Sequence, residues 1–228
     1  MNKQQISAPV LTIDGPSGAG KGTISKAIAE QLGWHYLDSG ALYRVLGIAA
    51  LDKGISIDNE VALAELAEHI DLQFVQDDQG QWLILLDKQN VAEGLQAEQV
   101  GAAASKLAVY PRVRESLLHK QRHYQKLPGL VADGRDMGST VFPKAQYKVF
   151  LTASAKERAN RRYKQLKEKG INANLPAVLE DIELRDKRDT ERASSPLSIA
   201  DGALYLDTSD MTINQAVNEV LTMLEERK

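Results

Sequence analysis

The feature that most constrains this chain is a glycine-rich segment between an apolar run and a helical pattern. Residues 9–14 are apolar and rich in β-branched side chains, which predicts a short buried strand. From Lys21 onward, apolar residues recur every three or four positions as far as Gly33, the glycine expected just beyond the end of a helix. A strand, a glycine-rich turn and a helix in this order predict a loop whose backbone N–H groups surround a phosphate.

The loop between this strand and helix has the chemistry that phosphate binding requires. Its glycines let successive N–H groups turn inward, the helix N-terminus adds partial positive charge, and Lys21 supplies a full charge. A flexible glycine-rich turn without function would explain neither the lysine nor its spacing from the glycines. The predicted phosphate-binding residues are Gly15, Pro16, Ser17, Gly18, Ala19, Gly20, Lys21, Gly22 and Thr23.

One position departs from the common form of such a loop. Lys21 is followed by Gly22, where most loops of this kind place a serine or threonine that binds Mg²⁺ directly. Because Mg²⁺ gives up its water reluctantly, we expect it to be held mainly by phosphates and water. Thr23 and Asp133 are the candidate protein contacts, and neither is assigned as a direct ligand. Asp133 could equally cap the turn that follows it.

Strand and helix patterns alternate along most of the remaining chain. Apolar strands that alternate with helices predict an α/β fold with a parallel sheet covered by helices on both faces. Thr212 and Gln215 form a capping-box pattern before the last helix. Strands are expected at 34–37, 130–133, 147–151 and 203–206, and helices at 42–49, 60–70, 111–118, 155–169, 176–193 and 213–224.

Residues 71–75 and 82–86 break this alternation. Both segments have strand patterns, and the polar turn between them ends in Gly80, which predicts an antiparallel hairpin. Because a hairpin does not belong to a parallel sheet, we interpret residues 58–100 as an inserted subdomain.

The composition excludes several kinds of protein. The chain has 228 residues, a net charge of −3 and no cysteine, so disulfides and thiolate chemistry are excluded and a generic basic surface for nucleic acid is not indicated. No apolar run approaches the length of a membrane span, and the first residues lack the apolar core of a signal peptide, so we expect a cytoplasmic protein. His119 and His123 are spaced like a metal-binding pair without an apparent third ligand, and we expect them to be surface or packing residues.

Charged residues are concentrated in the helix predicted at 176–193. Two polyanions that approach each other need several cationic groups to neutralise them, which favours a role in phosphoryl transfer. A solvated face of alternating charge is the competing interpretation, and the phosphate loop in the same chain favours the functional one. The residues that share one face by their spacing are Arg185, Arg188, Asp189 and Arg192.

A second cationic group lies in the preceding predicted helix. It consists of Arg158, Arg161 and Arg162, which share one helix face. Such a group could belong to a lid that closes over a triphosphate and excludes water. The alternative is an exposed set of arginines that pair with Glu157 or Glu168.

Further motifs follow the phosphate loop in order. They are the run LDSGALYR at 37–44, the serine and arginine that flank residues 110–112, the run DGRDMG at 133–138, and the charged helix at 185–192. Together with the Gly-Lys-Gly-Thr ending of the loop, these motifs resemble the bacterial cytidylate kinases, a family of P-loop nucleoside monophosphate kinases. The resemblance extends from the phosphate loop almost to the C-terminus and includes the hairpin.

The resemblance implies a P-loop NTPase-type parallel sheet, an inserted subdomain that binds the nucleoside monophosphate and contains the hairpin, and a helical lid. It also implies direct in-line transfer of the γ-phosphoryl group of ATP to CMP or dCMP with Mg²⁺, by a monomer without nucleic-acid or membrane partners. The implied division is a core with the phosphate loop at 1–38, the monophosphate-binding insertion at 39–105, core at 106–154, lid and acceptor-phosphate helices at 155–193, and core at 194–228.

The resemblance assigns the acceptor residues as well. Cytosine chemistry agrees, because its N4 amino group donates to a carboxylate while N3 and O2 accept from a guanidinium or hydroxyl. The implied cytosine contacts are Ser39, Ser105, Arg114 and Asp136, the acceptor-phosphate contacts are Arg44, Arg135 and Arg185, the ribose contact is Asp189, and Arg188 and Arg192 belong to the same site. The implied catalytic groups are Lys21, Arg135, Arg185 and Asp133.

Two alternatives remain at this stage. A P-loop kinase for another acceptor, such as UMP or AMP, would share the loop and most of the arginines. A regulatory nucleotide-binding module would share only the loop, hydrolyse its nucleotide slowly and be indifferent to CMP. The second arginine cluster disfavours the regulatory module.

Overall fold

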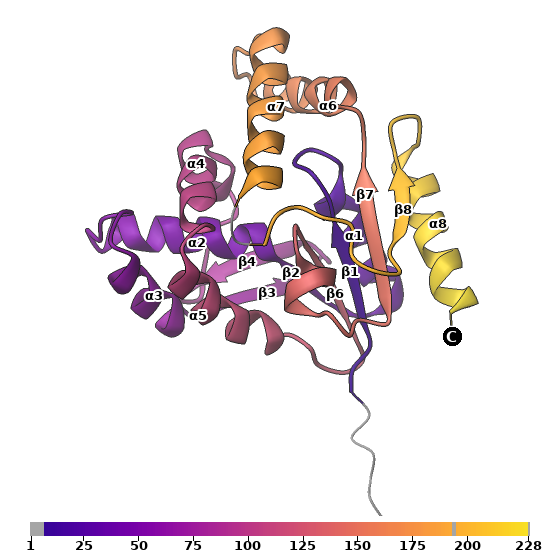
Figure 1. Ribbon diagram of the computed structural model, residues 1–228, viewed down its shortest axis with the longest axis horizontal. Coiled ribbons are helices and arrows are strands. Elements are labelled where there is room, and N and C mark those ends of the chain that lie inside the picture. The colour runs from indigo at the N-terminus through magenta and orange to yellow at the C-terminus, as the bar shows by residue number, and fades with distance from the viewer. Residues whose placement is uncertain (1–6, 193–194, 228) are drawn as a thin grey trace, which may run out of the picture. The chain divides into compact units, whose positions relative to one another are not determined.

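The computed structural model describes residues 7–192 and 195–227 (Figure 1). The described chain divides into two compact units. The hairpin unit comprises residues 7–9 and 33–132, and the loop unit comprises residues 10–32 and 133–227.

A five-stranded sheet has the order β2-β6-β1-β7-β8. All five residues of β1 are buried, as the apolar run predicts. β1 pairs in parallel with β7, and β7 pairs in parallel with β8, which confirms the predicted parallel sheet. The strand bounds are β1 Val10–Asp14, β2 His35–Asp38, β6 Leu130–Gly134, β7 Tyr147–Thr152 and β8 Leu204–Asp207.

Two helices of the loop unit lie side by side, α1 (Lys21–Leu32) and α8 (Ile213–Glu226) (Figure 1). The chain leaves α1 through Gly33, whose φ of +64° is a conformation that glycine adopts at no steric cost. α8 begins with the predicted capping box, in which Thr212 and Gln215 satisfy each other's backbone N–H groups.

α6 (Ala155–Glu168) and α7 (Leu175–Glu191) pack against each other in the loop unit (Figure 1). Ser154 begins α6 by accepting a hydrogen bond from the Glu157 N–H, and Asn174 begins α7 in the same way. Ile182 is the one buried residue of α7 among those described, so this helix contributes little apolar surface to the core.

In the hairpin unit, α2 (Ser39–Asp52) packs against α4 (Glu98–Leu107), and α3 (Glu60–His69) packs against α5 (Pro111–Arg122). The core of this unit includes fully buried leucines: Leu42, Leu46, Leu63, Leu107 and Leu117. The periodicity predicts α2, α3 and α5 but does not predict α4, the single-turn helix η1 (Gly94–Gln96) or the π-helical turn η2 (Met137–Val141) of the loop unit.

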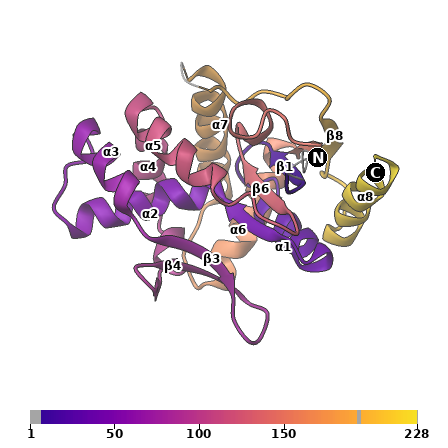
Figure 2. The same cartoon turned by 90° about the horizontal axis from the view of Figure 1, so that it is seen from below.

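The predicted hairpin is confirmed as an antiparallel pair, β3 (Leu72–Gln76) with β4 (Trp82–Leu86), in which Phe74 lies opposite Ile84 (Figure 2). A two-residue strand, β5 (Gln89–Asn90), completes a separate three-stranded sheet.

Aromatic rings attach this small sheet to the rest of the hairpin unit. The Tyr36 ring meets those of Phe74 and Trp82 edge-on, with centroids 5.9 and 5.1 Å away. The second tryptophan, Trp34, lies against Gly129, where a Cβ would come within 2.3 Å of the indole ring.

No helix within the described residues is long and apolar enough to cross a membrane. The division of the chain into five functional segments remains a prediction.

Candidate active site

The phosphate loop begins at a glycine that sterics require. Gly15 follows β1 with a φ of +150°, and a Cβ at this position would lie 1.9 Å from the carbonyl oxygen of Leu151. No side chain fits there without moving the backbone of β7. The parallel pairing of β1 with β7 therefore fixes where the loop can start.

Three carbonyl oxygens of the loop accept hydrogen bonds from side chains. The ammonium of Lys21 donates to Pro16 O at 2.8 Å, and the guanidinium of Arg158 donates to Ser17 O at 3.0 Å. The Ala19 carbonyl accepts from the Thr208 hydroxyl at 3.4 Å and from Arg161 at 3.5 Å. Each interaction comes from a side chain of the loop unit.

This pattern sets the direction of the loop's N–H groups. In a trans peptide, the carbonyl of one residue points opposite to the N–H of the next. With the carbonyls of Pro16, Ser17 and Ala19 held by side chains, the N–H groups of the following residues point the other way. The loop thereby presents backbone donors as an anion-binding cradle at the start of α1.

Asp14, the last residue of β1, is a buried carboxylate beside this loop. It accepts hydrogen bonds from the N–H groups of Met137 and Gly138, both at 2.8 Å. Burial raises the pKa of Asp14 to about 6, although these two amides and the charge of Lys21 act in the opposite direction. The sequence shows Asp14 only as the end of an apolar run.

The two candidate Mg²⁺ contacts differ in their surroundings. Asp133 is buried near the end of β6, and Thr23 is exposed in the first turn of α1. Each oxygen of Asp14 accepts a hydrogen bond from a backbone amide. Among the described residues, no three histidine, aspartate or glutamate side chains form a metal-binding group.

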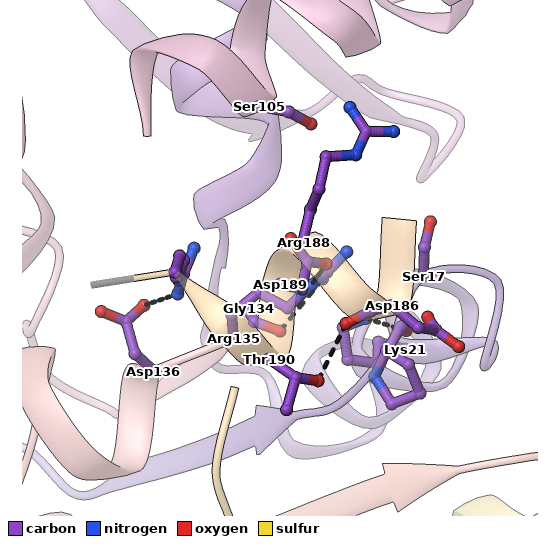
Figure 3. A network of polar contacts seen from close by, with 12 residues as sticks. Ser17, Lys21, Ser105, Gly134, Arg135, Asp136, Asp186, Arg188, Asp189 and Thr190 are labelled. Carbon is purple, nitrogen blue, oxygen red and sulfur yellow. Dashed lines mark hydrogen bonds and ion pairs between the residues drawn. The ribbon is translucent and has the colours of Figure 1, made fainter. Parts of the chain in front are cut away.

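The loop unit brings several predicted acceptor residues together. Arg135, just beyond β6, donates from Nε to Asp189 of α7 at 2.7 Å (Figure 3). Burial alone would raise the pKa of Asp189, but the positive charges of Arg135, Arg185 and Arg192 hold it below its usual value. Asp189 is therefore an anion that fixes the Arg135 guanidinium.

The predicted base-reading carboxylate is buried in the same unit. Asp136 lies 3.9 Å from the guanidinium of Arg192, which is the C-terminal cap of α7 and also donates to Ser195 O. Two predicted acceptor residues of α7, Arg185 and Arg188, differ in their exposure. Arg185 is partly buried, whereas Arg188 is exposed and its Nε donates to the Leu184 carbonyl at 3.3 Å.

Four other predicted acceptor residues belong to the hairpin unit. Ser39 is buried as the first residue of α2. Arg44 of α2 donates to Leu95 O at 2.9 Å, and Arg114 of α5 donates to Ala108 O at 3.3 Å. The Ser105 hydroxyl bonds back to Gly101 O of α4 at 3.0 Å. Arg44, Arg114 and Ser105 are thus each held by a backbone carbonyl of the hairpin unit.

Two of the three predicted lid arginines contact the loop. Arg158 is 4% exposed, and besides Ser17 O it contacts Ala153 O at 2.8 Å and the carboxylate of Asp186. Arg161 contacts Glu157 at 3.0 Å and the Thr208 carbonyl at 2.6 Å. Arg162 is partly exposed.

The sequence patterns do not indicate three residues near the loop, which are Asp14, Asp186 and Thr208. Asp186 lies between Arg185 and Lys187 in a run of mixed charges, and nothing in the sequence distinguishes it from the other charged residues of that run. Thr208 directly follows β8, and the rule that ligands bind at the carboxyl ends of parallel strands would have marked both it and Asp14. Figure 3 shows Asp186 and Lys21 in the same part of the loop unit.

Comparisons with known proteins agree with this geometry. The family model described as cytidylate kinase matches residues 11–226. The cytidylate kinase of Colwellia psychrerythraea is 54% identical over 95% of this chain and 96% of its own length. That of Marinomonas sp. is 55% identical over 93% of each chain, and that of Methylococcus capsulatus is 52% identical over 97% of this chain and 99% of its own.

One solved structure has a weak likeness to this chain. A gluconokinase from Sinorhizobium meliloti has a TM-score of 0.47 and 14% identity, with 98% of this chain and 94% of its own covered.

Proposed function

Because this chain belongs to the cytidylate kinase family, we propose that it transfers the γ-phosphoryl group of ATP to CMP or dCMP, giving ADP and CDP or dCDP. The observation that carries the proposal is the pairing, within the loop unit, of an N–H-lined phosphate loop with the Arg135–Asp189 ion pair. A phosphate loop alone serves many reactions, whereas a second, ordered guanidinium supports a phosphorylated acceptor.

ATP is proposed to bind through its phosphates at the loop, residues 15–23. The inward N–H groups and Lys21 would neutralise the β- and γ-phosphates. Mg²⁺ would bind these phosphates and add positive charge where it accumulates during transfer, with Thr23 and Asp133 reached directly or through water. Arg158 and Arg161 are proposed to belong to the ATP site because they contact the carbonyls of Ser17 and Ala19. Arg162 is proposed to belong to the same site.

The acceptor phosphate is proposed to bind Arg135, Arg185 and Arg44, and the ribose to bind Asp189. Asp189 is anionic and already accepts from Arg135, so it has a remaining oxygen for a ribose hydroxyl. Arg188 and Arg192 supply further positive charge, and Arg192 also lies close to Asp136.

Base recognition is proposed to rest on Asp136, Arg114, Ser39 and Ser105. A buried carboxylate accepts the N4 amino hydrogen of cytosine, while Arg114 donates to N3 or O2. UMP carries an acceptor in place of that amino donor, and Asp136 disfavours it for this reason. CMP is therefore favoured over the alternative acceptors.

The proposed reaction needs no covalent intermediate. The acceptor phosphate is already anionic near neutral pH, so no strong general base is required. Lys21, Arg135 and Arg185 act by position and charge, which are the main sources of catalysis in phosphoryl transfer. We also propose that α6 and α7 form a lid, that the enzyme is a monomer and that it acts in the cytoplasm.

A coupled assay of ADP release with CMP, dCMP, UMP and AMP tests the proposal. We expect turnover that depends on the acceptor and is fastest with CMP or dCMP. If turnover were fastest with UMP or AMP, that nucleotide would be the acceptor, and the protein would still be a nucleoside monophosphate kinase. Slow ADP release that ignores every acceptor would overturn the kinase proposal in favour of a regulatory module.

A further inference from the structure

A cavity of about 760 Å³ lies in the hairpin unit, beside the outer strand β3 and helix α5. None of its lining residues is a predicted ATP or CMP residue. Its volume lies within the range of about 300–1,000 Å³ that small-molecule sites occupy. We call it the hairpin pocket.

One wall of the hairpin pocket is apolar and aromatic. Phe74 and Tyr124 both line it, and their rings meet edge-on with centroids 5.6 Å apart. The Tyr124 hydroxyl donates to Leu72 O at 2.5 Å, which fixes the orientation of its ring. Burial raises the pKa of Tyr124 to about 12, so this ring stays neutral. A fixed pair of rings is a surface on which a flat ligand ring can pack.

The lining also carries an excess of positive charge. Lys120 and Lys126 line the pocket with one carboxylate, Glu68, and the nearby charge of Asp71 also acts on Lys120 and Tyr124. Glu68 accepts from the Ser116 hydroxyl at 3.3 Å, and Lys120 donates to the Ile70 carbonyl. Two ammonium groups near one apolar wall favour a ligand with negative charge.

Three of the four histidines in the chain line this pocket: His35, His119 and His123. His35 Nε2 lies 3.0 Å from Leu127 O, and His123 Nδ1 lies 3.0 Å from His119 O. A carbonyl accepts only from N–H, so the second nitrogen of each ring can also donate only when the ring is protonated. A protonated ring can therefore donate its second N–H to an anion.

We propose that the hairpin pocket binds a small organic anion that carries a flat unsaturated ring. The ring packs against Phe74 and Tyr124, and the anionic group lies near Lys120 and Lys126. The groups of the lining that can carry charge are His35, Glu68, His119, Lys120, His123, Tyr124 and Lys126. None of the residues proposed to bind ATP or CMP lines this pocket, so its ligand binds apart from both substrates.

Phenyl phosphate is the probe that tests this site, with the histidine Cε1–H signals in proton NMR as the readout. We expect saturable downfield movement of the His35, His119 and His123 signals, while His69, which is outside the lining, stays unmoved. No histidine belongs to the proposed active site, so binding at the phosphate loop does not imitate this result. Single histidine-to-glutamine variants assign the four signals.

Two reference compounds distinguish the contribution of the anionic group to binding from that of the aromatic ring. Inorganic phosphate lacks the ring and phenol lacks the charge, so each should bind at least about tenfold more weakly than phenyl phosphate, as loss of about 1.4 kcal/mol predicts. Equal shifts with phosphate alone, equal shifts with phenol alone, or equal movement of all four histidines would each overturn the proposal.

Variants complete the test. Phe74→Leu keeps an apolar side chain without the ring, and Lys126→Ala removes one charge, so each should weaken phenyl phosphate binding by about three- to tenfold. Lys53→Ala, an exposed lysine outside the lining, is the matched control and should bind as the wild type does. Circular dichroism checks the fold of each protein. Unchanged affinity in both pocket variants would refute the assignment.

Discussion

Arg158 and Asp186 join α6 to α7 through a two-pronged ion pair, with Nη1–Oδ1 at 3.0 Å and Nη2–Oδ2 at 2.5 Å. The same guanidinium holds the carbonyl of Ser17 in the phosphate loop. Asp186 therefore acts on the loop indirectly, through the guanidinium of Arg158. The helix that carries it also carries Arg185 and Asp189, which are proposed to bind the acceptor.

Replacement of Asp186 should impair ATP use. In Asp186→Ala the nearly buried Arg158 loses its carboxylate, and the Ser17 carbonyl loses a fixed donor. We expect the KM for ATP to rise by about tenfold and kcat to fall, because misplacement of a phosphate cradle affects both binding and transfer. Asp181→Ala, an exposed change on the same helix, is the control. An unchanged ATP dependence in steady-state kinetics would show that the ion pair does not position the loop.

Loss of the loop lysine should abolish most of the activity. Lys21 is 7% exposed and donates to Pro16 O at 2.8 Å, so its ammonium lies over the loop and not in an apolar core. Removing one such electrostatic group typically reduces the rate by about 10²–10³. The measurement is kcat for CMP phosphorylation by Lys21→Ala, with circular dichroism and a thermal melt to show that the fold is retained. Turnover near that of the wild type would contradict the proposed role.

The base preference should weaken in Asp136→Asn. An asparagine can turn its NH₂ group toward O4 of uracil, whereas the carboxylate opposes that acceptor. We therefore expect the ratio of kcat/KM for CMP to that for UMP to fall by at least about tenfold. CMP itself should react more slowly, because a charge-assisted hydrogen bond becomes a neutral one. If the ratio does not change, Asp136 does not read the base.

The buried Asp14 carboxyl should make folding stability depend on pH. Its pKa of about 6 in the folded protein is above the ordinary value of 3.8, so protonation favours the folded state. This contribution is fully present below pH 3.8 and is lost as the pH rises through about 6. The difference between the two values corresponds to about 3 kcal/mol at most.

The comparison is with Asp14→Asn, which cannot ionise. From pH 4 to pH 7, the free energy of unfolding of the wild type minus that of the variant should fall. The variant also loses one of the two acceptors that face Met137 and Gly138, which adds an offset that does not vary with pH. A constant or rising difference in urea unfolding experiments would be inconsistent with a raised pKa.

The phosphate loop could be predicted because its chemistry lies in nine consecutive residues, and the strand before it and the helix after it have clear periodicities. The Arg158–Ser17 contact could not be predicted in this way. It joins residues 141 positions apart, and nothing in the sequence near Arg158 distinguishes a buried guanidinium from an exposed one. Sequence spacing predicts which residues share a helix face but not what that face meets.

Two missed elements have local explanations. α4 (Glu98–Leu107) has only two large apolar side chains, Val100 and Leu107, and its other apolar residues are alanines, so a search for large apolar residues passes over it although Ala104 and Leu107 are buried. β5 has only two residues and is too short to show any period. By contrast, the long apolar stripe of α8 predicts that helix to within two residues.

Both tryptophans of this chain, Trp34 and Trp82, belong to the hairpin unit. Light absorbed at 295 nm therefore excites only that unit, and the loop unit makes no contribution to the emission. Fluorescence-detected denaturation reports on half of the protein, whereas far-ultraviolet circular dichroism sums over all of it. Coincident transitions by the two methods would mean that both units melt together, and separated ones would reveal a partly folded intermediate.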